Sequence, residues 1–146
     1  MPMTHNDRER QHRARLAQIE AVLVVAGSGD RARVNHERTL IERARMMAEE
    51  YGSHAATERG LEALDGLLRA VEDGDTPHRR EIGEFIGAVW NNKPLALGVL
   101  RTVDQRTADA MLDVLDAWRW ARVNLAENVK GGPRRIATAL RACRAQ

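Results

Sequence analysis

The sequence is poor in several residue types, and each shortage excludes a class of structure. Its single cysteine, Cys143, cannot form an internal disulfide. No stretch approaches the roughly 18 consecutive apolar residues that a membrane-spanning helix needs. The charged start of the chain also lacks the apolar segment of a secretory signal. We therefore expect a cytoplasmic protein that does not bind membranes.

Aromatic residues are equally scarce, with one Phe, one Tyr and three Trp among 146 residues. Clusters of Val and Thr are few, whereas apolar residues recur every three or four positions along almost the whole chain. This spacing is typical of helices and not of strands. With 43% hydrophobic residues, the chain is long enough to bury a core. The sequence predicts an all-α fold, a compact bundle of five to six helices in a single domain, 1–146.

Cap and turn residues divide this bundle into three parts. Residues 1–52 are predicted to form a charged helical hairpin. Its first helix, about 7–26, is capped by Asn6, its second, reaching residue 51, is capped by Asp30, and glycines follow both helices. Residues 57–129 are predicted to form a three-helix core, with helices 57–73, 76–91 and 104–129. Residues 133–146 are predicted to form a basic C-terminal helix that begins at Pro133. The segment 95–103 fits either a short helix or an extended chain.

Each predicted helix carries its apolar side chains along one stripe; the third, fourth and fifth helices are expected to form the core, and the first two a charged arm. In the hairpin, the apolar side chains form the stripe of Leu16, Ile19, Leu23 and Ala26 and the stripe of Leu40, Ile41, Ala44, Met47, Ala48 and Tyr51. In the fourth helix, Ile82, Phe85, Ile86, Val89 and Trp90 share one side. In the fifth, Ala108, Met111, Leu115 and Trp118 do so, and Arg122 interrupts the same stripe.

Basic residues gather near the C-terminus. Residues 117–146 contain seven basic side chains and one acidic one, whereas residues 51–116 contain seven basic and twelve acidic ones. The candidate contacts to a partner or to nucleic acid are Arg119, Trp120, Arg122, Lys130, Arg134, Arg135, Arg141 and Arg144. Trp120 lies opposite the apolar stripe of its helix, so it is either covered by the last helix or is a binding anchor.

A second candidate site lies at the start of the fourth helix. Thr76 provides a capping oxygen, and His78, Arg79 and Arg80 follow it in the first turn. Helix N-termini attract anions, so these four residues form a candidate anion site. The simpler interpretation is a capped helix whose first turn faces water.

Catalytic and metal-binding patterns are not found in the sequence. No two of the five histidines stand four residues apart with a glutamate between them, and no Cys-x-x-Cys accompanies them. Acid pairs such as Asp113 and Asp116 are most simply solvated charges. We expect no catalytic residue, no metal and no cofactor.

The centre of the chain resembles a known family. The residues that match are Gly60-Leu61-Glu62-Ala63-Leu64, Leu67-Leu68, Gly74-Asp75-Thr76, Ala88-Val89-Trp90-Asn91, Val103-Asp104 and Ala108-Asp109-Ala110-Met111. Over roughly 57–118 they resemble an uncharacterised family of short bacterial all-helical proteins with a Gly-Asp-Thr turn and a Trp-Asn helix end. Here Pro77 replaces a second glycine of that turn and Val89 replaces a first tryptophan. The resemblance implies a bacterial protein, often from a mobile element, without a recognised cofactor, and it leaves out the N-terminal hairpin and the C-terminal helix.

These observations favour binding over catalysis. The first hypothesis is a non-enzymatic protein-interaction module that binds another macromolecule or itself. The acidic middle and the basic end have nearly opposite charges, so the basic helix is expected to lie either against the acidic middle of its own chain or against that of a second copy. The second arrangement favours a homo-oligomer, most simply a homodimer. The alternative is a nucleic-acid-binding accessory or regulatory protein that uses the C-terminal arginines, although no recognition helix or stacking platform accompanies them.

Overall fold

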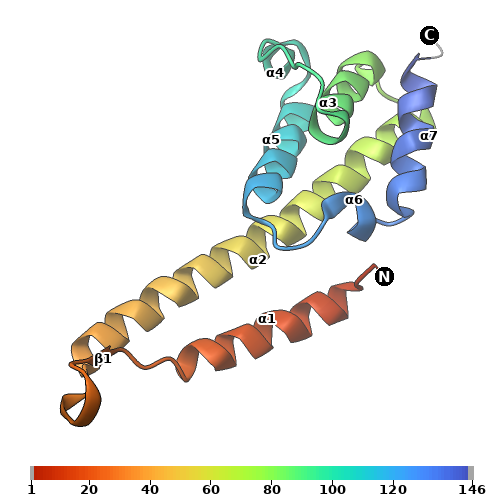
Figure 1. Ribbon diagram of the computed structural model, residues 1–146. Coiled ribbons are helices and arrows are strands. Elements are labelled where there is room, and N and C mark those ends of the chain that lie inside the picture. The colour runs from red at the N-terminus through yellow and green to blue at the C-terminus, as the bar shows by residue number, and fades with distance from the viewer. Residues whose placement is uncertain (1, 145–146) are drawn as a thin grey trace. The chain divides into compact units, whose positions relative to one another are not determined.

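The computed structural model describes residues 2–144, and their secondary structure is almost entirely helical (Figure 1). The elements in chain order are α1 His5–Glu20, β1 Val25–Ala26, a 3-10 helix η1 at Gly29–Arg31, β2 Arg33–Val34, α2 His36–Asp73, α3 Arg79–Asn91, α4 Val99–Thr102, α5 Gln105–Trp120, α6 Leu125–Asn128 and α7 Gly132–Arg144. The strands β1 and β2 pair in antiparallel fashion, with Val25 opposite Val34. The prediction of an all-α fold is confirmed, apart from this small hairpin.

The described chain divides into two compact units. We call residues 3–55 the N-terminal unit and residues 56–144 the C-terminal unit. The boundary falls within α2, so this helix contributes to both. Whether the two units fold as one domain, as the sequence analysis expects, stays a prediction. None of the helices in the described part of the chain is both long and apolar enough to cross a membrane.

The N-terminal helix differs from its predicted bounds at both ends. It begins after Thr4, not Asn6, because Thr4 and Asp7 each accept a hydrogen bond from the other's backbone amide. It ends at Glu20 and not near Ala26, because Val25 and Ala26 leave the helical path to pair with β2.

Helix α2 is one helix of 38 residues, so the predicted break at Gly52 and Ser53 is wrong. A mid-helix glycine costs only about 1 kcal/mol, which burial of neighbouring side chains offsets. Asp30 does not cap this helix as predicted, because the side chain of Asn35 accepts the amide of Arg38 instead. The predicted end at Asp73 is correct, and Gly74 follows it with a φ of 69°.

Of the two apolar stripes predicted for the N-terminal hairpin, Ile19 is buried, but most of the other stripe residues are not. Leu23, Leu40, Ile41 and Tyr51 are exposed, while His12, Thr39, Glu50 and Ser53 are buried. The reason is the composition of α1, whose side chains are mostly charged or polar. The two helices therefore meet through polar contacts, such as the 3.2 Å contact between His12 Nδ1 and Glu50 Oε1.

The C-terminal unit has a conventional apolar core. Ile82, Phe85 and Ile86 of α3 are fully buried, as their spacing predicts. They join buried side chains from the second half of α2, from α5, from α6 and from α7, which include Leu64, Leu68, Met111, Val114, Leu125, Ile136 and Ala139. This core holds α7 against the other helices.

Helix α3 begins at Arg79 and not at Pro77, although the Thr76 hydroxyl does accept the amide of His78 at 3.0 Å. Its predicted end is correct, since Asn92 has the left-handed φ of 52°. Within the ambiguous segment, residues 99–102 form the short helix α4.

Helix α5 begins at the predicted cap, Asp104, which accepts the amide of Thr107. It ends at Trp120 and not near Val129, because Asn124 starts the separate helix α6. Trp118 is 61% exposed, contrary to prediction. Ala117 takes the core position because Gly60 on α2 has no side chain there: a Cβ at Gly60 would lie 2.1 Å from Ala117 Cβ.

Candidate functional site

The candidate site is built on α7, the basic C-terminal helix. Pro133 lies in its first turn, as predicted, where no backbone donor is needed. Ile136 and Ala139 anchor one side of the helix in the core. The helix also approaches α3 closely, since a Cβ at Gly83 would lie 2.6 Å from Cys143 Cβ.

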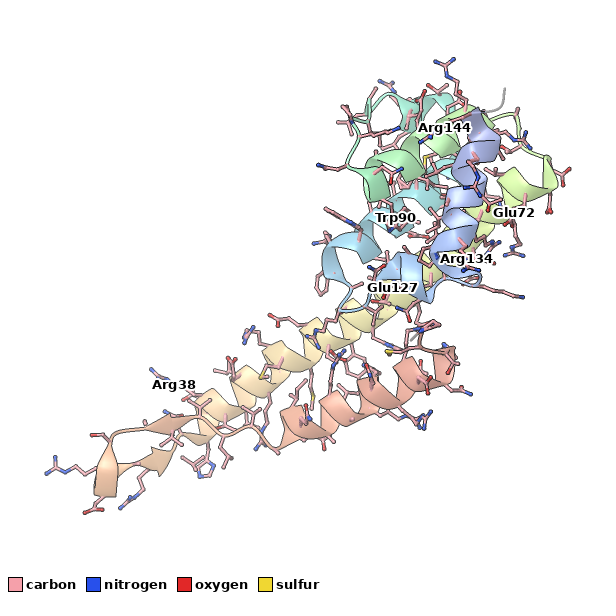
Figure 2. All side chains as sticks on the ribbon, turned by 45° about the vertical axis from the view of Figure 1, so that its right-hand side comes forward. Arg38, Glu72, Trp90, Glu127, Arg134 and Arg144 are labelled. Carbon is pink, nitrogen blue, oxygen red and sulfur yellow. The ribbon has the colours of Figure 1, made fainter. Side chains whose placement is uncertain are left out.

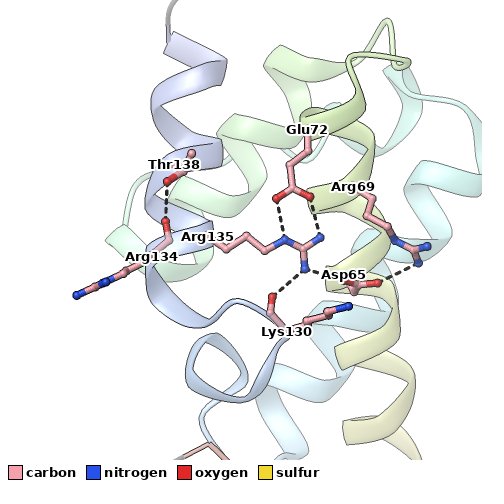
Figure 3. Close-up of polar contacts among 7 residues, drawn as sticks. All are labelled: Asp65, Arg69, Glu72, Lys130, Arg134, Arg135 and Thr138. Atoms are coloured by element: carbon pink, nitrogen blue, oxygen red, sulfur yellow. Dashed lines mark hydrogen bonds and ion pairs between the residues drawn. The ribbon is translucent and has the colours of Figure 1, made fainter.

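Arg135 is the most strongly held arginine of this helix. Its Nε and a terminal nitrogen donate to the two carboxylate oxygens of Glu72, each at 2.8 Å, and its other terminal nitrogen donates to Asp65 at 2.6 Å (Figure 3). That nitrogen also donates to the Lys130 carbonyl at 2.8 Å, and Asp65 contacts Arg69 as well. The Arg135 side chain is only 13% exposed.

These contacts change the ionisation of the groups. The hydrogen bonds from Arg135 hold the pKa of the Glu72 carboxyl below its usual value, and the same bonds raise the pKa of Arg135. Arg135 therefore holds α7 to α2 within the C-terminal unit, and its donors point at groups of the chain itself. Sequence reasoning grouped it with the other arginines, because its acidic partners lie more than 60 residues earlier in the chain.

Arg134, Arg141 and Arg144 are arranged differently. They are exposed, and within residues 2–144 none of them has a carboxylate partner. Figure 3 shows the Arg134 side chain turned away from the Arg135 network. Positions i, i+7 and i+10 lie on one side of a helix, so these three charges form a row along α7. Figure 2 labels the first and the last of them, Arg134 and Arg144. Lys130 is exposed in the turn that precedes the helix.

The other basic candidates lie at the end of α5. Arg119 pairs with Asp116 at 2.8 Å, and its guanidinium lies 5.1 Å from the centre of the Trp120 ring. Trp120 is half-buried, and Arg122 is exposed in the connection to α6. These three residues are close in sequence to one another but do not line the groove described next.

A groove of about 500 Å³ runs beside α7. Its lining comes from the end of α3, from α6 and from α7, and consists of Trp90, Asn91, Ala126, Pro133, Ile136, Ala137, Leu140, Arg141 and Arg144. Most of these side chains are apolar, whereas Arg141 and Arg144 bring positive charge. Trp90, which the sequence places in the core, is only partly buried and forms part of the lining.

A smaller hollow of about 230 Å³ adjoins this groove and shares Leu140 and Arg144 with it. Arg80, Lys93 and Glu84 are among its other lining residues, so two of the three additional charges are positive. One pattern in the sequence indicates the groove. Three apolar residues at helical spacing, Pro133, Ala137 and Leu140, lie beside the buried side of α7 and make its apolar surface wider.

The four residues of the predicted anion site each contact a group of the chain itself. Arg79 donates to the Val71 carbonyl at the end of α2, and Arg80 contacts Glu84 within α3. His78 Nε2 lies 3.5 Å from Asp104, and the Thr76 hydroxyl accepts the His78 amide. The Thr107 hydroxyl, foremost, keeps the pKa of Asp104 below its usual value. The structure thus brings these residues to one corner but points their donors at protein groups.

Metal ligands and the thiol of Cys143 are the remaining groups of the described chain that could carry chemistry. Over residues 2–144, no group of three or more His, Cys, Asp or Glu side chains is arranged to hold a metal ion. Cys143 is partly buried, and this burial raises the pKa of its thiol.

Comparison with known proteins agrees with the division into units. A family model described as Family of unknown function (DUF7673) matches residues 61–144. The match lies within the C-terminal unit and extends through α7, so the expectation that the basic helix falls outside the family is wrong. No curated protein and no solved structure matches the chain.

Proposed function

The chain belongs to this family of unknown function, and we propose that it is a non-enzymatic protein-interaction module whose α7 groove binds an acidic, apolar segment of a partner protein. The observation that supports the proposal most is the combination in one groove of an apolar lining with two arginines that lack carboxylate partners in the described chain.

The apolar lining provides the attraction. Trp90, Ile136 and Leu140 offer side chains that a partner's apolar residues can cover, and burial of such surface from water drives protein association. Tryptophan is enriched among the residues that dominate binding energy. Because the lining residues comprise apolar groups, one amide and two arginines, they suit packing and charge pairing better than proton transfer.

The arginines provide the selectivity. Arg141 and Arg144 lie at the groove, and Arg134 extends their row along α7. A carboxylate on the partner forms short, two-point hydrogen bonds with a guanidinium. An acidic segment is therefore favoured over a basic one, and its association is faster at low salt.

Selection from a random peptide library tests this proposal. The full chain is the bait, and the variant Ala137→Glu, which places a carboxylate in the groove, is used to remove peptides that bind elsewhere. We expect the surviving peptides to combine Asp or Glu with Leu, Phe or Trp. Peptides rich in Lys or Arg, or an absence of peptides that distinguish the two baits, would contradict the proposal.

Nucleic-acid binding is the second candidate, because the row of Arg134, Arg141 and Arg144 could contact successive phosphates. Each phosphate contact steepens the dependence of log affinity on log salt by about 0.9. Titration of duplex DNA across a salt series tests it, with reversal of the three charges as the variant. Micromolar binding that is lost in that variant would favour this candidate, but the apolar lining of the groove has no role in it.

A further inference from the structure

The groove and the smaller hollow follow one another along the seam between α3 and α7. These two helices lie side by side (Figure 1). Gly83, early in α3, faces Cys143 near the end of α7. Trp90, near the end of α3, lines the groove together with Pro133 from the first turn of α7. The helices therefore run in opposite directions, with the groove toward one end of their seam and the smaller hollow toward the other.

Two glycines of α3 leave the smaller hollow unfilled. Gly83 and Gly87 stand about one turn apart on the helix, and both line the hollow. At Gly87 the nearest non-neighbouring atom to an added Cβ would be Lys93 Cδ, at 3.7 Å, which is an ordinary contact. The space at this position can therefore take side-chain atoms of a bound segment.

Positive charge dominates the lining of the smaller hollow. Its charged residues are Arg80, Glu84, Lys93 and Arg144. Arg80 donates to Glu84 at 3.3 Å, so these two charges balance each other. Lys93 and Arg144 are exposed, and within residues 2–144 neither has a carboxylate partner. Two positive charges are thus left over, and carboxylates are their natural complement.

We propose that the smaller hollow is the acidic subsite of the α7 groove, where carboxylates of the partner segment bind Lys93 and Arg144. The apolar residues of the same segment then lie against Trp90 and Ile136 in the groove. Arg144 lines both spaces, so one segment can occupy them together. This inference rests on the proposed function, and it adds where along the segment the acidic residues must stand.

The dimensions favour an extended segment. A helix with its side chains is about 10–12 Å across, which is too wide for a hollow of about 230 Å³. From Ile136 to Arg144 the seam is about 12 Å long, since a helix rises about 1.5 Å per residue. An extended chain covers this length with about four residues, at about 3.3 Å each. We therefore expect the acidic residues to stand about four positions from the apolar residue in the groove.

Charge reversal tests the subsite. The chain has two lysines, Lys93 and Lys130, and both are exposed. Lys93→Glu places a carboxylate at the smaller hollow, and Lys130→Glu is the matched control, because Lys130 lines neither space. The probe is a fluorescent peptide selected on the full chain as described above, and its anisotropy measures binding. We expect Lys93→Glu to weaken binding at least about tenfold, since charged hydrogen bonds are lost, and Lys130→Glu to change it much less.

A second variant fills the smaller hollow without changing the charge. Gly87→Gln puts a side chain into the space that the carboxylates would take, and we expect it to weaken binding of the same peptide about tenfold. Gly66→Gln on α2 is the matched control, because Gly66 has open space and lines neither the groove nor the hollow. Both variants should be at least as stable as wild type, since glutamine favours a helix more than glycine does. Equal binding by the two variants would contradict the acidic subsite.

Rearranged peptides test the spacing. In the rearranged probe the acidic residues are moved next to the apolar residue, which keeps the composition and the net charge. An extended segment of this kind cannot reach the groove and the smaller hollow at once, so we expect the rearranged probe to bind about tenfold more weakly. Equal binding by the two peptides would overturn the extended arrangement.

The variants also separate this inference from the proposed function. A probe that binds Ala137→Glu as tightly as the wild-type chain contradicts the proposed function, and the acidic subsite fails with it. A probe that Ala137→Glu weakens, but that binds Lys93→Glu and Lys130→Glu equally, overturns the acidic subsite alone.

Discussion

Arg135 and Glu72 form a two-point ion pair, with both nitrogen–oxygen distances at 2.8 Å. The pair joins α7 to the last turns of α2 across 63 residues of sequence. It holds the helix that supplies most of the lining of the candidate groove, and it directs the donors of Arg135 at carboxylates of the chain itself. Of the other arginines of α7, Arg141 and Arg144 line the groove, and Arg134 is exposed to solvent.

Replacing Arg135 by Met should destabilise the protein. The substitution leaves Asp65 and Glu72 without their shared cation, and hydrogen bonds to charged groups contribute about 2 kcal/mol. Arg134→Met is the matched control on the neighbouring, exposed position, and it should change the free energy of unfolding by less than about 0.5 kcal/mol. Urea denaturation of the two variants measures the difference. Equal stabilities would mean that the Arg135 network does not hold α7.

The same pair predicts a dependence on pH. Because the pKa of Glu72 is lower in the folded than in the unfolded chain, the pair stabilises the fold above the unfolded pKa, and this stability is lost as pH falls through the folded pKa. Glu72→Gln should therefore destabilise the protein at pH 7, and its difference from wild type should shrink below about pH 4. Unfolding curves at the two pH values test this. A difference that grows on acidification would have the wrong sign.

Two glycines of α2 should respond oppositely to alanine. Gly66 has open space where a Cβ would lie, so Gly66→Ala should stabilise the protein by about 1 kcal/mol through its helix propensity. Gly60 faces Ala117, and a Cβ there would lie 2.1 Å from Ala117 Cβ. Gly60→Ala should cost about 1–3 kcal/mol, because α2 and α5 must move apart. Thermal unfolding compares the two, and a stabilising Gly60→Ala would show that these helices are not in close contact.

The thiol of Cys143 should react slowly in the folded protein. Burial raises its pKa, so little thiolate is present at neutral pH, although nearby Arg79 acts in the opposite direction. Labelling with an aromatic disulfide reagent measures the rate, and the same chain in urea provides the reference. A folded chain that reacts faster than the unfolded one would instead indicate an activated thiol.

Local chemistry predicted several of the helix ends. Asp104 caps α5, Asn92 ends α3, Gly74 follows α2 and Pro133 opens α7, and each effect involves neighbours within four residues. Asn124 is the same kind of cap residue and begins α6, although the predicted fifth helix runs past it to residue 129. Fold class followed from such local patterns together with helical spacing.

Contacts between distant residues could not be predicted in this way. The spacing of Leu40, Ile41 and Tyr51 indicates a helix with an apolar side, but it does not say what covers that side. What covers it depends on the partner helix, and α1 contacts α2 through polar groups, such as His12 with Glu50, and not through an apolar surface. Likewise, Ala117, and not Trp118, packs against Gly60 of α2, which lies far earlier in the chain, and Arg135 binds carboxylates of α2. The groove exists only once these long-range contacts are formed.

The affinity of a selected acidic peptide for two neighbouring variants of α7 tests the proposed function most directly. Ala137 lines the groove, whereas Thr138 is exposed on the same helix outside it, so Ala137→Glu and Thr138→Glu add the same charge at adjacent positions. The account predicts that Ala137→Glu weakens binding at least about tenfold, or about 1.4 kcal/mol, and that Thr138→Glu weakens it much less. Equal affinities for the two variants would contradict binding in the groove.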